Sequence, residues 1–84
     1  MSAWLRCTLE PGMFPGEYAV EMDTSEVGRI SLFASGDKVR ANDSVIRVEV
    51  LEDNGGGILV CLPSAAFEIS SRTVKVPRSA IVQT

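Results

Sequence analysis

Hydrophobic and polar residues alternate along most of this chain with a period of two residues. In residues 45–50, branched apolar residues at the even positions alternate with Arg47 and Glu49. A period of two is typical of a β-strand that buries one face. The same alternation recurs in residues 18–23, 29–34 and 72–76. The sequence therefore predicts an all-β fold, since no window of useful length shows a helical period.

A glycine-rich turn joins residues 45–50 to a second apolar run, so the two form the central hairpin of the predicted fold. Residues 53–57 read DNGGG, and such residues accept positive φ at little cost, which lets the chain reverse. The run 58–62 has no polar break, so we expect both of its faces to be covered. Pro63 lacks the amide that a continuing ladder needs, and we expect the strand to end there.

Two aromatic residues fall where the alternation points away from the core. In the first predicted strand, residues 4–9, Leu5, Cys7 and Leu9 share the core face, which leaves Trp4 on the outer face or near an end. In residues 29–34 the core face takes the even positions, so Phe33 also points outward. Trp4 and Phe33 are therefore candidate contact residues.

Met13 and Phe14 lie between two Pro-Gly pairs in the predicted loop 10–17. Proline presets φ and glycine supplies positive φ beside it, so both pairs indicate turns. Two outcomes stay open for the apolar residues between them. They fold back over one end of a barrel as a plug, or they stay exposed and form part of a contact surface.

Two further segments are ambiguous, and the end of the chain is clearer. Residues 39–44 read either as a helical or 3₁₀ turn or as irregular chain. Residues 64–69 read as a short strand or an irregular crossing, with Phe67 and Ile69 as its buried residues. Residues 74–76 form a strand, 77–80 suit a single 3₁₀ turn, and 81–82 can add a last short strand.

This ending resembles the close of SH3-like barrels, in which a penultimate strand, one 3₁₀ turn and a final strand follow one another. The resemblance implies a small antiparallel SH3-like barrel of five to seven short strands, and a small β-sandwich is the alternative. Such barrels serve many unrelated functions, so the resemblance implies architecture alone. We expect residues 1–84 to form a single all-β domain.

Composition narrows the function more by exclusion than by assignment. The chain has 84 residues, 45% of them apolar, and no window reaches the ~18 consecutive apolar residues of a membrane helix. Its first ten residues have neither the basic start nor the apolar run of a signal peptide. We expect a cytoplasmic protein without a membrane partner.

Catalytic and metal-binding chemistry has few residues to draw on. Histidine is absent, which removes histidine-activated serine and cysteine nucleophiles. Cys7 and Cys61 read as two buried thiols or as one disulfide, and two thiolates do not fill a zinc shell. Residues 55–57 fit a hairpin turn, because no lysine or helix follows as in a phosphate loop. We expect no cofactor, no metal and no enzymatic activity.

Charge is unevenly placed on a chain whose net charge is −3. Residues 10–26 contain five acids and no base, whereas residues 69–84 contain three bases and no acid. Both runs fit a solvated surface. They also fit complementary faces that steer self-association or the approach of a partner.

The sequence favours a binding or assembly module that contacts another protein or itself, as a homo-oligomer of which a dimer is the commonest form. Its candidate contact residues are Trp4, Phe33, Met13 and Phe14. The alternative is weak nucleic-acid or ribosome binding through Arg72, Lys75 and Arg78, together with Arg6, Arg40 or Arg47. No aromatic platform accompanies those bases, which disfavours nucleic acid. An accessory subunit of a larger enzyme is a third hypothesis.

Overall fold

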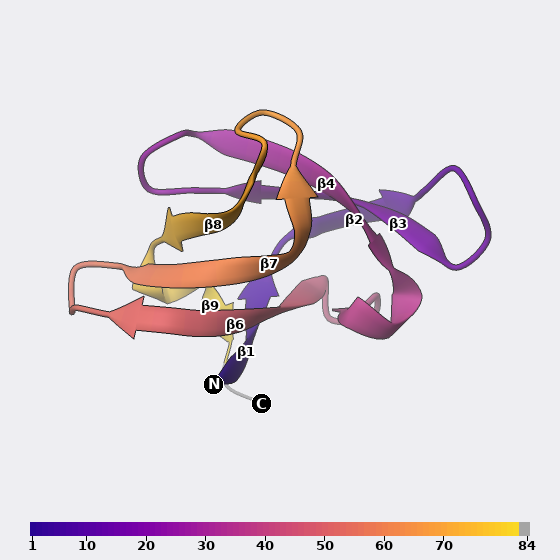
Figure 1. Cartoon of the computed structure of the whole chain (residues 1–84). Coiled ribbons are helices and arrows are strands. Elements are labelled where there is room, and N and C mark those ends of the chain that lie inside the picture. Colours follow the sequence, from indigo (N-terminus) through magenta and orange to yellow (C-terminus); the bar gives the residue numbers. More distant parts are fainter. Residues whose placement is uncertain (83–84) are drawn as a thin grey trace.

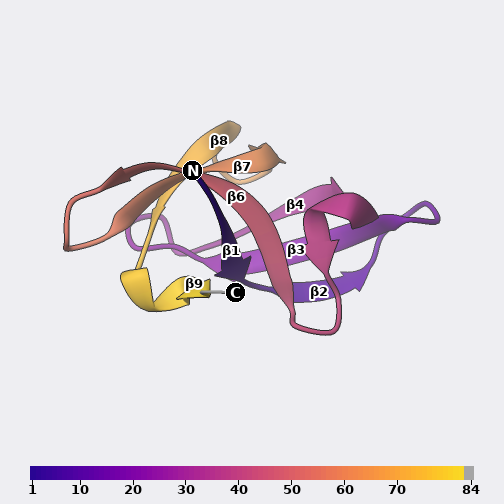
Figure 2. The same cartoon turned by 90° about the horizontal axis from the view of Figure 1, so that it is seen from below.

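Two antiparallel β-sheets make up the structure, a computed structural model that describes residues 1–82. In both views β2, β3 and β4 lie together, and the end of β7 approaches β4 (Figures 1 and 2). Strands β6 and β7 run side by side in Figure 1. The larger sheet has the order β8-β7-β6-β1-β9, with β5 paired to β6. Its strands are β1 (Ser2–Arg6), β5 (Val39–Arg40), β6 (Val45–Asp53), β7 (Ile58–Ala66), β8 (Ser71–Val76) and β9 (Ile81–Val82). The smaller sheet contains β2 (Thr8–Pro11), β3 (Glu17–Asp23) and β4 (Arg29–Ser35), in the order β2-β3-β4.

The core lies between the inner faces of the two sheets, where the alternation predicted it. Every second residue of β4 is buried, and the residues between them are half-buried or exposed. In β6, Val45, Ile46 and Val48 are buried, and the alternation ends after the half-buried Val50. The fully buried large side chains come from both sheets, and no charged or polar residue among positions 1–82 is buried with them. These side chains are Leu5, Met22, Ile30, Leu32, Ile46, Leu62, Val20, Val45, Val60 and Val76.

The first predicted strand is broken at Cys7, which corrects the expectation of one strand over residues 4–9. β1 ends at Arg6 and pairs with β6, whereas β2 begins at Thr8 and pairs with β3. The Cys7 amide donates a hydrogen bond to the Ser44 carbonyl (3.0 Å). The chain therefore passes from one sheet to the other here. The alternation of apolar and polar residues continues across this bend, so the sequence pattern gives no sign that the strand breaks there.

Both cysteines are free thiols, so the disulfide alternative is wrong. Each is half-buried rather than fully buried. Burial raises the pKa of the Cys7 thiol to about 11, which keeps it protonated near neutral pH. Cys7 therefore acts as a small apolar side chain at the junction of the two sheets.

Strand β7 does not end at Pro63 but continues to Ala66, which corrects a second prediction. The pairing of β7 with β8 is interrupted between Cys61 and Ala66. Pro63 lies in this irregular stretch, where the pairing does not require a backbone N–H donor from it. The run 58–62 was also expected to be covered on both faces. Ile58, Val60 and Leu62 are buried, but Leu59 and Cys61 are only half-buried.

The ambiguous segment 39–44 divides into strand β5 and a turn that ends at Ser44, whose φ is +54°. A 3₁₀ turn, η1 (Gly36–Lys38), precedes β5. At the end of the chain, β8, the 3₁₀ turn η2 (Arg78–Ala80) and β9 follow one another as predicted.

The all-β class is confirmed, and the strands are more finely divided than expected. Nine strand segments lie within residues 1–82, instead of five to seven, because the first strand breaks at Cys7 and β5 adds a short one. Closure of the two sheets into one SH3-like barrel stays a prediction. No helix in residues 1–82 is long and apolar enough to span a membrane.

Candidate interaction surfaces

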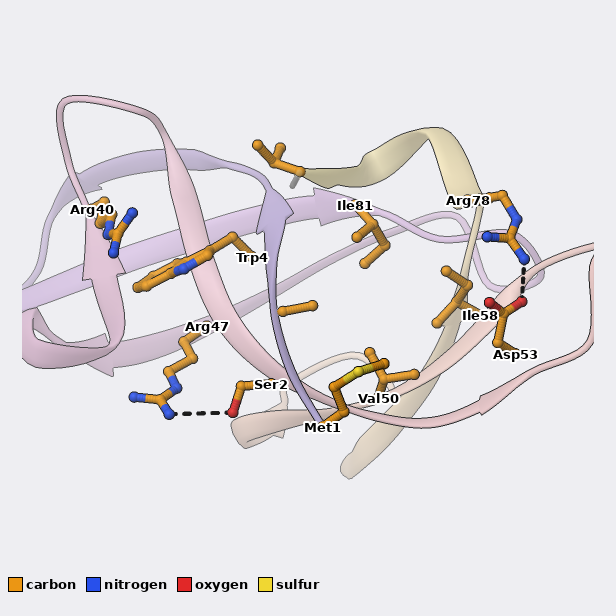
Figure 3. A pocket seen from close by; sticks show the side chains of 12 residues that line it. Met1, Ser2, Trp4, Arg40, Arg47, Val50, Asp53, Ile58, Arg78 and Ile81 are labelled. Carbon is orange, nitrogen blue, oxygen red and sulfur yellow. Dashed lines mark hydrogen bonds and ion pairs between the residues drawn. The ribbon is translucent and has the colours of Figure 1, made fainter. Parts of the chain in front are cut away.

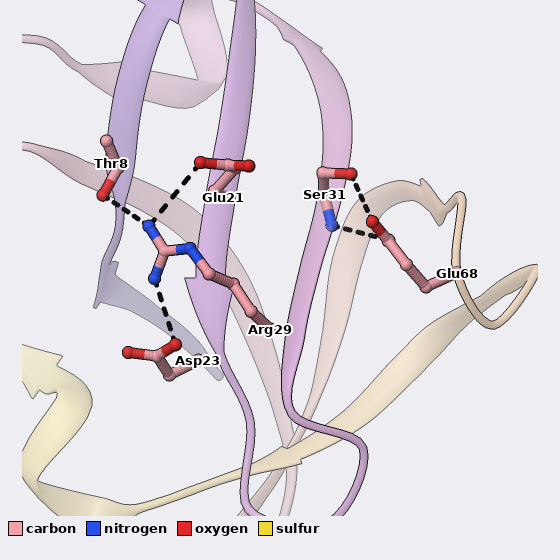
Figure 4. A network of polar contacts seen from close by, with 6 residues as sticks. All are labelled: Thr8, Glu21, Asp23, Arg29, Ser31 and Glu68. Carbon is pink, nitrogen blue, oxygen red and sulfur yellow. Dashed lines mark hydrogen bonds and ion pairs between the residues drawn. The ribbon is translucent and has the colours of Figure 1, made fainter.

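The outer face of the three-stranded sheet carries a polar network centred on Arg29 (Figure 4). The Arg29 guanidinium donates to Asp23 Oδ1 and to Thr8 Oγ1, both at 3.0 Å. It also lies 3.6 Å from Glu21 Oε1. Arg29 thus joins side chains of all three strands, and it partly neutralises the acidic run that the sequence places here.

An aromatic pair lies on this same face, where β4 approaches β7. The Phe33 and Phe67 rings meet edge to face, with centroids 5.4 Å apart and planes at 75°. Such pairs are worth about 0.5–1.5 kcal/mol beyond the area they bury. Phe67 was predicted to be buried but is 61% exposed. It lies in the turn after β7, beyond the reach of the strand alternation.

Four hydrogen bonds fix the aromatic pair across the two sheets. The Phe67 amide donates to the Ser31 carbonyl (2.9 Å), and the Ser64 hydroxyl donates to the Phe33 carbonyl (2.6 Å). Glu68 accepts from both the Ser31 amide (2.7 Å) and the Ser31 hydroxyl (2.6 Å), as Figure 4 shows. Beside the pair is a shallow hollow of about 200 Å³, whose lining includes Glu10 and Ala19. The rings are therefore held in place although one of them faces solvent.

Hydrogen bonds from Ser31 lower the pKa of Glu68 below its ordinary value of 4.5. A lowered pKa in the folded protein contributes stability above pH 4.5, and this contribution is lost as the pH falls through the folded pKa. We expect the melting temperature of the wild type to exceed that of Glu68→Gln at pH 7, and the difference to shrink below pH 4.5. Thermal melts of both proteins across pH 3–7 test this.

The comparison of the two proteins is needed because the pKa values of Asp37 and Glu49 are also lowered. Their titration affects both proteins equally and cancels in the difference. A difference in melting temperature that stays constant or grows on acidification would contradict the assigned role of Glu68.

Met13 and Phe14 lie at the tip of the loop between β2 and β3 and are 75% and 66% exposed. The plug interpretation is therefore wrong, and the exposed alternative holds. The loop spans residues 12–16 only, because Glu10 and Pro11 belong to β2 and Glu17 begins β3. It is tied down at its base, where Gly12 donates to the Glu17 carbonyl and Gly36 to the Gly16 carbonyl, both at 2.7 Å.

The sheet register places Phe33 and this loop at the same end of the smaller sheet. Phe33 pairs with Ala19, and two residues further along β4 Ser35 pairs with Glu17, next to the loop. Phe33 therefore lies toward the end of the sheet from which the loop with Met13 and Phe14 extends. Trp4, the fourth candidate contact residue, lies elsewhere, on β1 of the larger sheet.

Trp4 is half-buried in a hollow of about 690 Å³ whose lining comes from β1, β5, β6, β7, η2 and β9 (Figure 3). The Arg40 guanidinium lies over the indole, 4.2 Å from the ring centroid. Arg47 is the cross-strand partner of Trp4 on β6, and its Nη2 donates to Ser2 Oγ (3.2 Å). Trp4 thus points away from the core, as predicted, and lies between two arginines.

The three bases of the nucleic-acid alternative are engaged in contacts within the protein. Arg72 Nε donates to the Leu62 carbonyl (3.0 Å), Lys75 Nζ lies 3.8 Å from Glu26 Oε1, and Arg78 pairs with Asp53. Arg72 and Lys75 are three positions apart on β8, so strand alternation directs them to opposite faces. The structure does not join these bases into one surface.

Sequence reasoning missed two contact residues, Phe67 as an exposed aromatic and Arg40 as the partner of Trp4. Neither residue has a local sequence signal, since each owes its position to a strand distant in the sequence.

No group of three cysteine and carboxylate side chains in residues 1–82 is placed to hold a metal ion. No protein-family model matches this chain, and no curated protein or solved structure matches it.

Proposed function

We propose that this chain is a protein-binding and assembly module that associates with a second copy of itself through the Phe33–Phe67 surface. The observation that carries the proposal is the ordered but solvent-facing aromatic pair. Large apolar side chains exposed together on a small domain are typical of a contact surface. Met13 and Phe14, exposed in the loop beyond this end of the sheet, are the further apolar residues that we expect to contribute to the contact.

The acidic side chains around the Phe33–Phe67 pair oppose self-association less than their number suggests. Glu68 is held by Ser31, while Glu21 and Asp23 share Arg29. A twofold contact brings each surface against itself, so unpaired acids would repel one another. Arg29 offsets part of the charge of Glu21 and Asp23, which reduces this repulsion, whereas Glu68 stays charged because its partner Ser31 is neutral.

A homodimer is the simplest assembly that covers this surface. A contact of ordinary size buries about 800 Å² per partner, which is about one sixth of the 4953 Å² that this chain exposes. The outer face of β2, β3 and β4 with the loop 12–16 is the part of the fold that offers clustered aromatic side chains for such a contact. Rigid aromatic anchors of this kind often contribute most of the binding energy.

Replacing Phe67 with serine is expected to weaken the self-association at least tenfold without unfolding the domain. The ring is exposed in the monomer, so its removal costs little folding free energy, but it removes an aromatic anchor from the contact. Sedimentation velocity over a concentration series measures the dissociation constant, and a thermal melt checks the fold.

Leu51→Ser is the matched control, since Leu51 is 54% exposed on β6 and lies outside the proposed surface. We expect Leu51→Ser to leave the dissociation constant unchanged. Equal weakening by both substitutions, or by neither, would refute the assignment of the contact to Phe67.

A further inference from the structure

The hollow around Trp4 has a cationic end, an apolar middle and a far end where an arginine and an aspartate neutralise each other (Figure 3). Arg40 and Arg47 lie on either side of the Trp4 ring at the cationic end. At the far end Arg78 is paired with Asp53. Between them the lining is apolar, with Val50, Ile58 and Ile81 among its side chains.

The two arginines beside Trp4 are free to bind an anion. Within residues 1–82, no carboxylate lies within salt-bridge distance of Arg40 or Arg47. Glu49 lies two residues after Arg47 on β6. Its carboxylate accepts a hydrogen bond from Ser2 Oγ at 3.1 Å and lies 3.3 Å from the Met1 amino group. These contacts, with a smaller contribution from the charge of Arg47, hold the pKa of Glu49 below its ordinary range, so Glu49 stays charged while its direct partners are Ser2 and the Met1 amino group.

The chemistry of the cationic end and of the apolar middle indicates which class of ligand the hollow can bind. A guanidinium offers a planar fork of donors that matches a carboxylate, and two of them beside each other suit an anionic segment. The indole packs against Arg40 and restricts that side chain, which lowers the entropy lost on binding. The apolar middle of the hollow favours a ligand that carries a hydrophobic side chain next to its charges.

We propose that this hollow binds an acidic peptide segment of a partner protein, with its carboxylates on Arg40 and Arg47. An apolar side chain of the peptide enters between Val50, Ile58 and Ile81. This inference goes beyond the self-association proposed above and uses a different surface, so either can fail without the other.

A peptide fits this site better than a nucleic acid. The Arg40 guanidinium already covers one face of the Trp4 ring, which leaves less of the indole for a base to stack on. The protein has a net charge of −3, which disfavours a long polyanion, whereas a short peptide places its charges only at the cationic end of the hollow.

Trp4 is the only tryptophan in the chain, so its fluorescence reports directly from the site. We expect the pentapeptide EELEE to change the Trp4 emission saturably at micromolar to millimolar concentration, and calorimetry to give the same dissociation constant. The peptide KKLKK is expected to produce no saturable change. Added salt should weaken the binding, because the arginines are solvent-exposed.

Arg47→Gln should weaken EELEE binding at least fivefold, whereas Lys75→Gln removes the same charge outside the hollow and should leave it unchanged. If Arg47→Gln lowers the melting temperature, Arg47→Lys takes its place and should weaken binding by a smaller factor. Absence of binding up to millimolar EELEE overturns the proposal, and so does equal weakening by the two neutralising variants. Saturable binding of oligouridylate but not of EELEE overturns it in favour of RNA.

Discussion

Leu62→Ala is expected to lower the free energy of unfolding by roughly 2–5 kcal/mol, the range for a buried leucine cut back to alanine. Leu62 is fully buried on β7, within the cluster that both sheets share. A domain of 84 residues has a total stability of about 4–13 kcal/mol at 0.05–0.15 kcal/mol per residue. The loss is therefore a large fraction of the whole, and urea unfolding followed by circular dichroism measures it.

Leu51→Ala makes the same truncation on the neighbouring strand β6, where the side chain is 54% exposed. We expect it to change the unfolding free energy by no more than about 0.5 kcal/mol. The contrast tests which face of the hairpin lies in the core. Equal effects of the two truncations would show that the burial pattern of β6 and β7 is wrong.

Gly55→Val is expected to destabilise the protein by roughly 1–2 kcal/mol, the cost of a side chain in the left-handed region. Gly55 has φ +85° at the tip of the hairpin that joins β6 to β7. A β-branched residue rarely adopts that conformation. No steric clash contributes, because a Cβ at this position meets no atom within 4 Å. Thermal or urea unfolding of the variant measures the effect.

Gly56→Val is the control within the same turn. Gly56 lies outside the left-handed region, and a Cβ there also meets no atom within 4 Å. We expect this variant to be neutral or slightly stabilising, because it reduces the freedom of the unfolded chain. If the two valines had the same effect, the special conformation of Gly55 would be refuted.

The sequence predicted those parts of the fold that depend on local alternation. Ile30, Leu32 and Ala34 were assigned to the core face of one strand, and all three are buried. The 3₁₀ turn after Pro77 was predicted in the same way, because proline stops the strand at that position. In each case a residue and its immediate neighbours contain the physical reason.

The errors arose where contacts distant in the sequence decide the structure. The strand breaks at Cys7 because its amide bonds the carbonyl of Ser44, in the turn before β6. Pro63 is tolerated because the β7–β8 pairing is irregular beside it. Phe67 is exposed because its turn is fastened to Ser31 on another sheet. A two-residue period carries no signal of any of these contacts.

The candidate contact residues show the same division. Alternation directed Trp4 and Phe33 away from the core, and both are half-buried at the surface with an aromatic or cationic partner. Their partners, Phe67 and Arg40, lie more than thirty residues away in the sequence. Charge counting likewise singled out the basic C-terminal run, whereas the two arginines that the fold brings together beside Trp4 are Arg40 on β5 and Arg47 on β6.

The mass of the protein in solution tests the proposed assembly most directly. Light scattering behind a sizing column, at two concentrations about tenfold apart, gives this mass without a label. We predict a multiple of 9.0 kDa at the higher concentration, and a shift toward the monomer for Phe67→Ser under the same conditions. A mass of 9.0 kDa at both concentrations would contradict self-association through the Phe33–Phe67 surface.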